Sequence, residues 1–133
     1  MPVLEDALSR ETTEDARTEL LSVLDELYDR IANRRRIYAM LERSAHDWPE
    51  LTALYYHRGR RGLLEKLSSY LERRIASGDL RPVPDVPTAA RFILETVAWF
   101  ARHRHGDADS AMITDEAAHK TTLYLLAAAF LKD

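Results

Sequence analysis

The chain contains no cysteine, only four glycines, and no apolar run long enough to cross a membrane. The absence of cysteine excludes disulfides and thiolate-bound metals. The first residues, Met1 to Asp6, lack the basic start and the apolar stretch of a signal peptide. We therefore expect a cytoplasmic protein that makes no contact with a membrane.

Neither sign of charge dominates the sequence. The 19 Lys and Arg residues oppose 22 Asp and Glu residues, and the net charge of −3 gives no general attraction to nucleic acid. Apolar residues make up 46% of the chain and charged residues 31%, as in a water-soluble globular domain. The sequence also lacks a Gly-x-Ser-x-Gly motif, so nucleophilic catalysis has no support. We predict that the chain is not an enzyme and holds no cofactor.

The few turn residues and the few alternating polar and apolar stretches favour an all-α fold of about five helices. Apolar residues recur every three or four positions over residues 16–31, after Thr12 and Asp15, which resemble a helix-starting capping pair. Residues 33–36 interrupt this rhythm, either at a bend between two helices or at a solvated turn. Residues 1–11 show no strong pattern and are predicted to be flexible, so the folded domain should span residues 12–133.

The boundaries of the later helices are marked by local signals. Pro49 suits the first turn of a helix that should run to about residue 76, where Gly78 ends it. A proline-rich connector follows. Asp85 or Thr88 can cap the next helix, which should run to about residue 103, and Thr114 opens the last helix.

The last two helices carry more apolar surface than a monomer can cover. The final helix has no charged side chain over residues 121–131, and the helix before it is apolar over more than half of its circumference. A surface helix needs a narrower apolar stripe. We therefore predict a dimeric four-helix bundle with a second copy, although a monomer with a central helix remains the alternative. The predicted interface residues are Val97, Phe100, Ala101, Leu123, Ala127 and Phe130.

Aromatic and polar side chains share one face of the penultimate helix, at about 100° per residue. Such a face combines apolar surface with polar groups that can orient a ligand. An ordinary core filled with aromatic side chains would show the same pattern. The predicted pocket residues are Phe92, Thr96, Trp99 and His103, with Tyr38, Leu41, Tyr55 and Tyr56 on the other walls.

Two further patterns are weaker. Arginines at residues 34–36 and 58–61 could bind phosphate or nucleic acid, but a solvated helix face balanced by acidic residues explains them better. Glu116 and His119 have the spacing used in di-iron bundles, yet the chain has no second Glu-x-x-His. His103 and His105 suit the end of a helix, where cations are favoured. We predict no metal site.

An ordered series of fragments resembles the C-terminal half of tetracycline-repressor (TetR) family regulators. The fragments lie at residues 37–46, 49–51, 78–82, 89–92 and 99–101, and the resemblance covers roughly residues 12–132. It implies a helical domain that dimerises through its last two long helices and holds a small-molecule pocket. TetR-like regulators bind DNA through an N-terminal helix-turn-helix domain, and no such pattern precedes Thr12. Contact with DNA is therefore expected only through a domain absent from this chain.

The leading hypothesis is an effector-sensing and homodimerisation domain of a TetR-like transcriptional regulator. A small, mostly apolar ligand would favour one arrangement of the helices and so control DNA binding by an attached helix-turn-helix domain. Two alternatives stay open. One is a stand-alone helical dimerisation or interaction module, and the other is a small helical enzyme.

Overall fold

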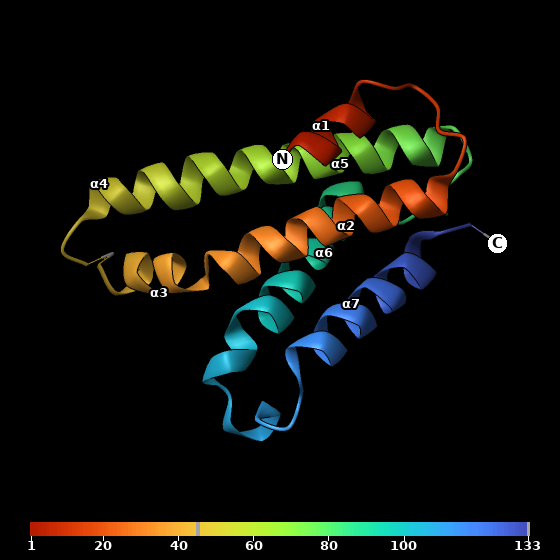
Figure 1. Cartoon of the computed structure of the whole chain (residues 1–133). Coiled ribbons are helices and arrows are strands. Elements are labelled where there is room, and N and C mark those ends of the chain that lie inside the picture. The colour runs from red at the N-terminus through yellow and green to blue at the C-terminus, as the bar shows by residue number, and fades with distance from the viewer. Residues whose placement is uncertain (45, 133) are drawn as a thin grey trace.

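The computed structural model describes residues 1–44 and 46–132, and the side chains of Thr52, Tyr55, Tyr56 and His57 lie outside the described part. Within it the chain forms seven α-helices, one π-helical segment and two 3-10 turns, without a named strand (Figure 1). The all-α prediction is confirmed, whereas the helix count exceeds the predicted five. None of the described helices is long and apolar enough to span a membrane.

Helix α1 (Pro2–Leu8) lies in the segment that was expected to be flexible. Its Leu4 and Ala7 are fully buried, and the backbone N–H groups of Val3 and Leu4 donate to the carboxylate of Glu26 at 2.8 and 3.1 Å. The structure thus differs from the sequence-based expectation at this point. A helix of two turns is too short to show a periodic pattern, and its stability comes from tertiary packing.

Helices α2 (Ala16–Asn33) and α3 (Arg35–Ser44) follow each other across a bend. Asp15 caps α2 by accepting a hydrogen bond from the Thr18 N–H at 3.1 Å. Arg34 leaves the helical conformation, with φ −108° and ψ 10°. The interruption at residues 33–36 is therefore a bend between two helices. The buried stripe of α2 consists of Leu20, Val23, Leu24, Leu27, Tyr28 and Ile31.

Three segments form one helical rod: α4 (Pro49–Thr52), the π-helical segment (Ala53–Gly59) and α5 (Arg60–Ala76) (Figure 1). The sequence predicted a single helix here, and the π-helical segment is the difference. Gly78 ends the rod with a φ of +83°, which glycine adopts without a Cβ clash. The following residues return to the end of the chain, since the Arg81 N–H donates to the Phe130 carbonyl at 2.9 Å.

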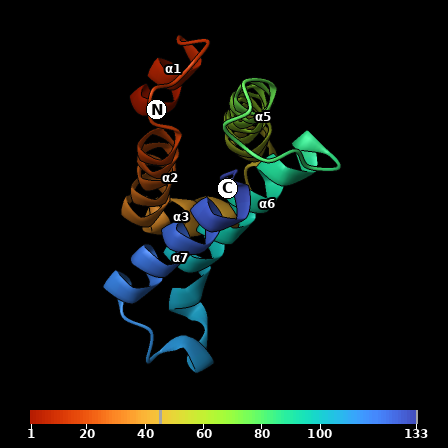
Figure 2. The ribbon, with the colours of Figure 1, turned by 90° about the vertical axis from the view of Figure 1, so that its right-hand side faces the viewer.

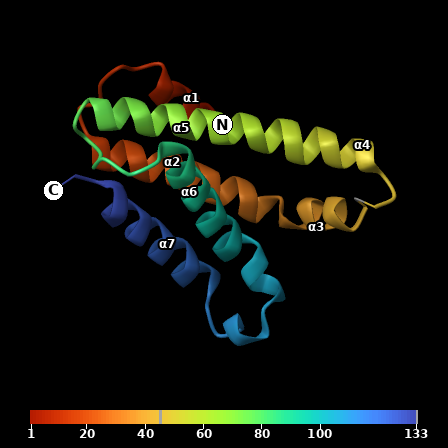
Figure 3. The same cartoon turned by 180° about the vertical axis from the view of Figure 1, so that it is seen from behind.

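Helices α6 (Val86–Ala101) and α7 (Asp115–Phe130) form a hairpin joined by two 3-10 turns, His103–Gly106 and Ala108–Ser110 (Figure 3). The end-on view shows α2 and α5 as separate rods (Figure 2). Both α1 and α6 contact each of these rods, and α7 contacts α2 and α6. Helix α6 is therefore central to the fold. Its buried face consists of Ala89, Ala90, Ile93, Leu94, Val97 and Ala101.

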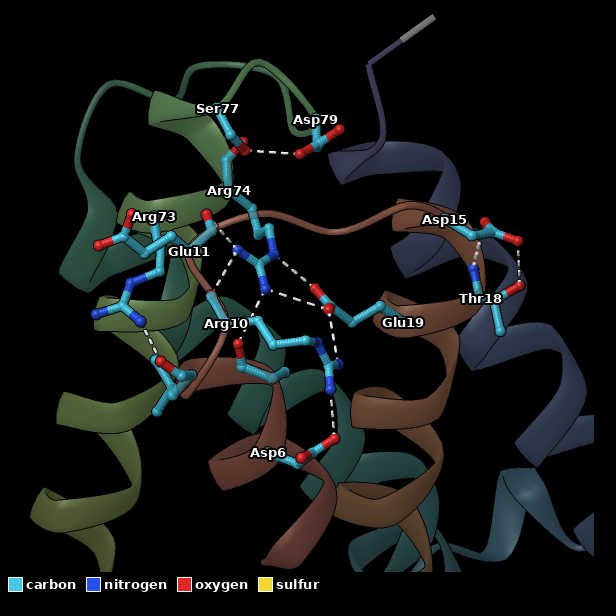
Figure 4. A network of polar contacts seen from close by, with 12 residues as sticks. Asp6, Arg10, Glu11, Asp15, Thr18, Glu19, Arg73, Arg74, Ser77 and Asp79 are labelled. Atoms are coloured by element: carbon cyan, nitrogen blue, oxygen red, sulfur yellow. Dashed lines mark hydrogen bonds and ion pairs between the residues drawn. The ribbon is translucent and has the colours of Figure 1, made fainter.

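A buried arginine joins α1, α2 and α5 at one end of the molecule (Figure 4). Arg74 is 0% exposed, and its guanidinium donates to the two carboxylate oxygens of Glu19 at 2.6 and 3.2 Å. It also donates to the carbonyls of Ala7, Arg10 and Glu11, at 2.9, 3.2 and 3.0 Å. These five bonds match the five N–H donors of a guanidinium. The buried charge is therefore fully paired.

Candidate ligand pocket

A pocket of about 500 Å³ lies between the α2–α3 bend, the π-helical segment with the start of α5, and the second half of α6. This volume falls within the range of small-molecule sites, about 300–1,000 Å³. Its apolar lining comes from Ile31, Leu54, Leu63, Leu94 and Ala98. Since these residues belong to four different elements, the pocket exists only in the folded domain.

Two local irregularities shape this pocket. The bend at Arg34 turns α3 away from the line of α2, and the π-helical segment ends at Gly59 beside it. A Cβ added at Gly59 would meet no atom within 4 Å, so the glycine leaves open space. π-helical turns interrupt regular packing and occur often at functional sites. The pocket therefore lies where two helices depart from regular geometry.

Two ion pairs cross the polar side of the pocket. Arg60 pairs with Glu95, which also accepts a hydrogen bond from Arg91 at 2.8 Å. Arg102 pairs with Glu42 at 2.5 Å and lies over the Tyr38 ring, 5.5 Å from its centroid. Both carboxylates of the lining therefore already have cationic partners, and the pairs join α6 to α3 and α5.

The other two arginines of the lining lie on α2 and at its end. Arg30 and Arg34 are exposed, and no carboxylate in the described part of the chain pairs with either. Their spacing of four residues places them on one side of the helix. Together with His103, they form the edge of the pocket that faces solvent.

The model of one protein family matches residues 18–122, and it describes the C-terminal domain of AefR-like transcriptional repressors. The chain belongs to this family. It is a TetR-family C-terminal domain, as the resemblance predicted. Such domains belong to transcriptional regulators, which are generally not enzymes. No curated protein and no solved structure gave a match to the chain.

The residues predicted for the pocket of this repressor-type domain lie in different places. Tyr38 and His103 line it, while Leu41 is buried outside the lining. Phe92 and Trp99 also lie outside it and are 58% and 38% exposed. Thr96 donates to the carbonyl of Phe92 on its own helix at 2.7 Å. The side chains of Tyr55 and Tyr56 are outside the described part of the chain.

The way α6 ends explains why His103 does not lie on the same face as Phe92 and Trp99, as the sequence predicted. The helix ends at Ala101, and Arg102 has a φ of −130° and a ψ of −62°. His103 begins a 3-10 turn, in which each residue rotates further than in an α-helix. A helical wheel extended beyond Ala101 therefore places His103 with Phe92 and Trp99, whereas the folded chain places it in the pocket.

The residues predicted for a dimer interface also have two environments. Val97, Ala101, Ala127 and Phe130 are buried within the single chain, at 0–5% exposure. Phe100 and Leu123 are half-buried. The large apolar side chains left exposed on the same two helices are Phe92, Trp99, Tyr124 and Leu125. The apolar surface of α6 and α7 thus divides between residues buried in the core of the chain and these four exposed residues, which we call the outer face of α6 and α7.

Sequence reasoning did not assign Arg30, Ile31, Leu63, Leu94 or Ala98 to the pocket. Arg34 and Arg60 were noted only as members of a basic patch. A signal existed in the spacing of Arg30 and Arg34 beside Ile31, which places two cations next to the buried stripe of α2. That signal does not show which other helices lie opposite, because the partners come from distant parts of the chain.

The histidines predicted to have no metal role make contacts with protein groups. His119 lies 2.6 Å from Asp25 and stacks on the Tyr28 ring at 4.4 Å, which joins α7 to α2. Asp29 lies nearby. In the described part of the chain, Asp25, Asp29 and His119 form the group of side chains that could hold a metal ion. His105 contacts Arg35. The pKa of His105 is lowered, mainly by burial and to a smaller extent by the positive charge of Arg35.

Proposed function

We propose that the chain is the effector-sensing and homodimerisation domain of a TetR-like transcriptional regulator. The observation that carries this proposal is the pocket of about 500 Å³ on one side of α6, together with an apolar outer face on the other. Family membership supports it, because TetR-family C-terminal domains typically bind effectors and dimerise. One helix therefore contacts both the ligand and the partner subunit.

The proposed partner is a second copy of the chain, bound to the outer face of α6 and α7. This face exposes Phe92 and Trp99 on α6 and Tyr124 and Leu125 on α7, with exposures of 38–71%. Apolar patches formed by adjacent helices mark interaction sites. A two-fold axis between two such faces would produce the four-helix bundle that the sequence predicts.

The proposed mechanism is a shift between two arrangements of α6. A ligand contacts Leu94 and Ala98 on the pocket side, while Trp99 on the outer side contacts the partner. The ligand changes the population of the two arrangements only if it binds one of them more tightly. In a protein with attached helix-turn-helix domains, the change at α6 would alter their separation and hence operator binding.

The two helical glycines allow a matched test of the pocket. A Cβ meets no atom within 4 Å at either Gly59 or Gly62, but only Gly59 lines the pocket. The neutral dye Nile red should bind the wild-type domain with a rise in fluorescence. We expect Gly59→Phe to abolish this rise and Gly62→Phe to retain it, with unchanged circular dichroism. Equal dye binding by both variants would place the ligand site elsewhere.

The proposed interface is tested by sedimentation velocity. The wild-type chain should sediment as a dimer, and Leu125→Arg should sediment as a monomer, because the new charge has no partner at the centre of an apolar interface. Met40→Arg is the control, since Met40 is 53% exposed on α3, away from the outer face of α6 and α7. A dimeric Leu125→Arg variant would show that the two copies meet through another surface.

A further inference from the structure

The lining of the pocket carries an excess of positive charge. Four arginines and two glutamates line it, although the chain as a whole has a net charge of −3. Both glutamates are engaged by Arg60 and Arg102. The excess therefore resides on Arg30 and Arg34, which have no carboxylate partner in the described part of the chain.

Helix energetics account for only part of this arrangement. Arg30 lies in the last turn of α2 and Arg34 at its C-cap, where a cation gains about 0.3–1 kcal/mol from the helix dipole. That gain does not depend on which side of the helix carries the charge. Both residues nevertheless line the pocket, beside the apolar side chain of Ile31. The position of the pair therefore calls for a second explanation.

The chemistry of the two side chains indicates what they bind. Guanidinium groups form planar, bidentate hydrogen bonds with carboxylate and phosphate, and such charge-assisted bonds are stronger than neutral ones. The apolar wall of Ile31, Leu63 and Leu94 lies within the same pocket. It lowers the local dielectric constant and so strengthens attraction to an anion.

We infer that the effector is an amphipathic anion. Its apolar body lies against Ile31, Leu63, Leu94 and Ala98, and its carboxylate or phosphate head group lies between Arg30 and Arg34. This inference rests on the proposed function and narrows it, because the sequence alone predicts a mostly apolar ligand. A mostly apolar ligand fits the wall of the pocket, and the two arginines at its edge add the anionic head group.

The position of Arg34 also connects the head group to the shape of the domain. Arg34 lies at the bend between α2 and α3, while Tyr38 and Glu42 line the pocket from α3. An anion held at the bend would fix α3 relative to α2. A change in the position of α3 would in turn act on Arg102, at the end of α6, through the ion pair between Arg102 and Glu42. Head-group binding thus has a contact path to the helix that carries the outer face.

Four ten-carbon compounds test the inference by displacing bound Nile red below their micelle-forming concentrations. They are decanoate, decyl phosphate, decanol and decylammonium, and they share one tail but differ in head group. We expect an anion to bind at least about tenfold more tightly than decanol, and decylammonium to bind most weakly. The ratio of decanoate to decyl phosphate affinity separates a carboxylate effector from a phosphate effector. Added salt should weaken the binding of the anions but not of decanol.

Variants assign the preference to the two arginines. The double variant Arg30→Gln with Arg34→Gln should bind decanol as the wild type does and lose the preference for anions. Arg17→Gln is the matched control, because Arg17 is exposed on α2 and lies outside the pocket. Arg30→Lys with Arg34→Lys should retain part of the preference, since the charge remains but the bidentate geometry is lost.

Two results would overturn the inference without touching the proposed function. One is decanol that displaces the dye as well as decanoate does, while Gly59→Phe still blocks the pocket. The other is an anion preference that survives in the double glutamine variant, which would assign it to other residues. Failure of the wild-type domain to bind Nile red would instead contradict the proposed sensing role itself.

Discussion

The two ends of the space between α2 and α5 use arginine in opposite ways. At the end near α1, Arg74 is 0% exposed and donates five hydrogen bonds to Glu19 and to three backbone carbonyls. At the other end, Arg30 and Arg34 are exposed and have no carboxylate partner in the described residues. Arg74 uses its five N–H donors within the protein, whereas the other two arginines have donors available for the proposed ligand.

The difference follows from which helix fills the space. At the first end α1 contacts both α2 and α5, and its last turn supplies a carbonyl to the buried guanidinium. At the second end a pocket lies between the bend after α2, the π-helical segment and α6. Similar side chains therefore stabilise the fold in one place and, in the proposed function, bind the ligand in the other, according to the backbone around them.

The largest expected effect is the loss of stability on breaking the closed network. Arg74→Met would leave the carboxylate of Glu19 buried without its main partner, and removal of one member of a buried ion pair costs about 3–5 kcal/mol. Urea denaturation followed by circular dichroism measures the change. A loss below about 1 kcal/mol would show that water reaches Glu19 and that the network is not closed.

The pH dependence of stability comes next and belongs to the same network. Burial by itself would raise the pKa of Glu19, but hydrogen bonds from Arg74 and Arg10 lower it below the ordinary value of 4.5. The stabilisation is therefore fully present above pH 4.5 and is lost as the pH falls through the pKa of the folded state. Thermal melts from pH 6 to pH 3 should show a steeper fall for the wild type than for Glu19→Gln.

A control separates Glu19 from the other carboxylates. The hydrogen bond from Arg104 also lowers the pKa of Asp115, but Asp115 is exposed. Asp115→Asn should therefore reduce the fall in melting temperature between pH 6 and pH 3 less than Glu19→Gln does. An equal reduction by the two variants would show that the buried position of Glu19 adds nothing to its acid sensitivity.

The sequence predicted the parts of this comparison that depend on local signals. Pro49 and Gly78 mark helix ends by chemistry that acts within a few residues, and the structure has helix boundaries at these positions. The predicted capping pair begins at Thr12, whereas the structure places the N-cap of α2 three residues later, at Asp15. The burial of Arg74 could not be predicted in this way. Arginine usually marks a surface position, and the groups that pair with Arg74 lie more than 50 residues away in the chain.

The candidate pocket was predictable only in part for the same reason. The sequence assigns Tyr38 and His103 to it and places them on two separate helices. It could not show that α6 would end at Ala101 and that Phe92 and Trp99 would remain on the outer face. Periodicity identifies an apolar helix but does not rank its faces when most of the circumference is apolar.

The smallest expected effect is the change in stability when Arg30 and Arg34, at the pocket end of the space between α2 and α5, are replaced. Because Arg30 and Arg34 are exposed, the double glutamine variant should lose only their interaction with the helix dipole when no ligand is present, about 0.3–1 kcal/mol for each arginine. Saturating decanoate should stabilise the wild type, since a ligand that binds only the folded state raises the unfolding free energy. The variant should gain much less. If the variant is strongly destabilised without ligand, these two arginines serve the fold as Arg74 does, and the contrast between the two ends disappears.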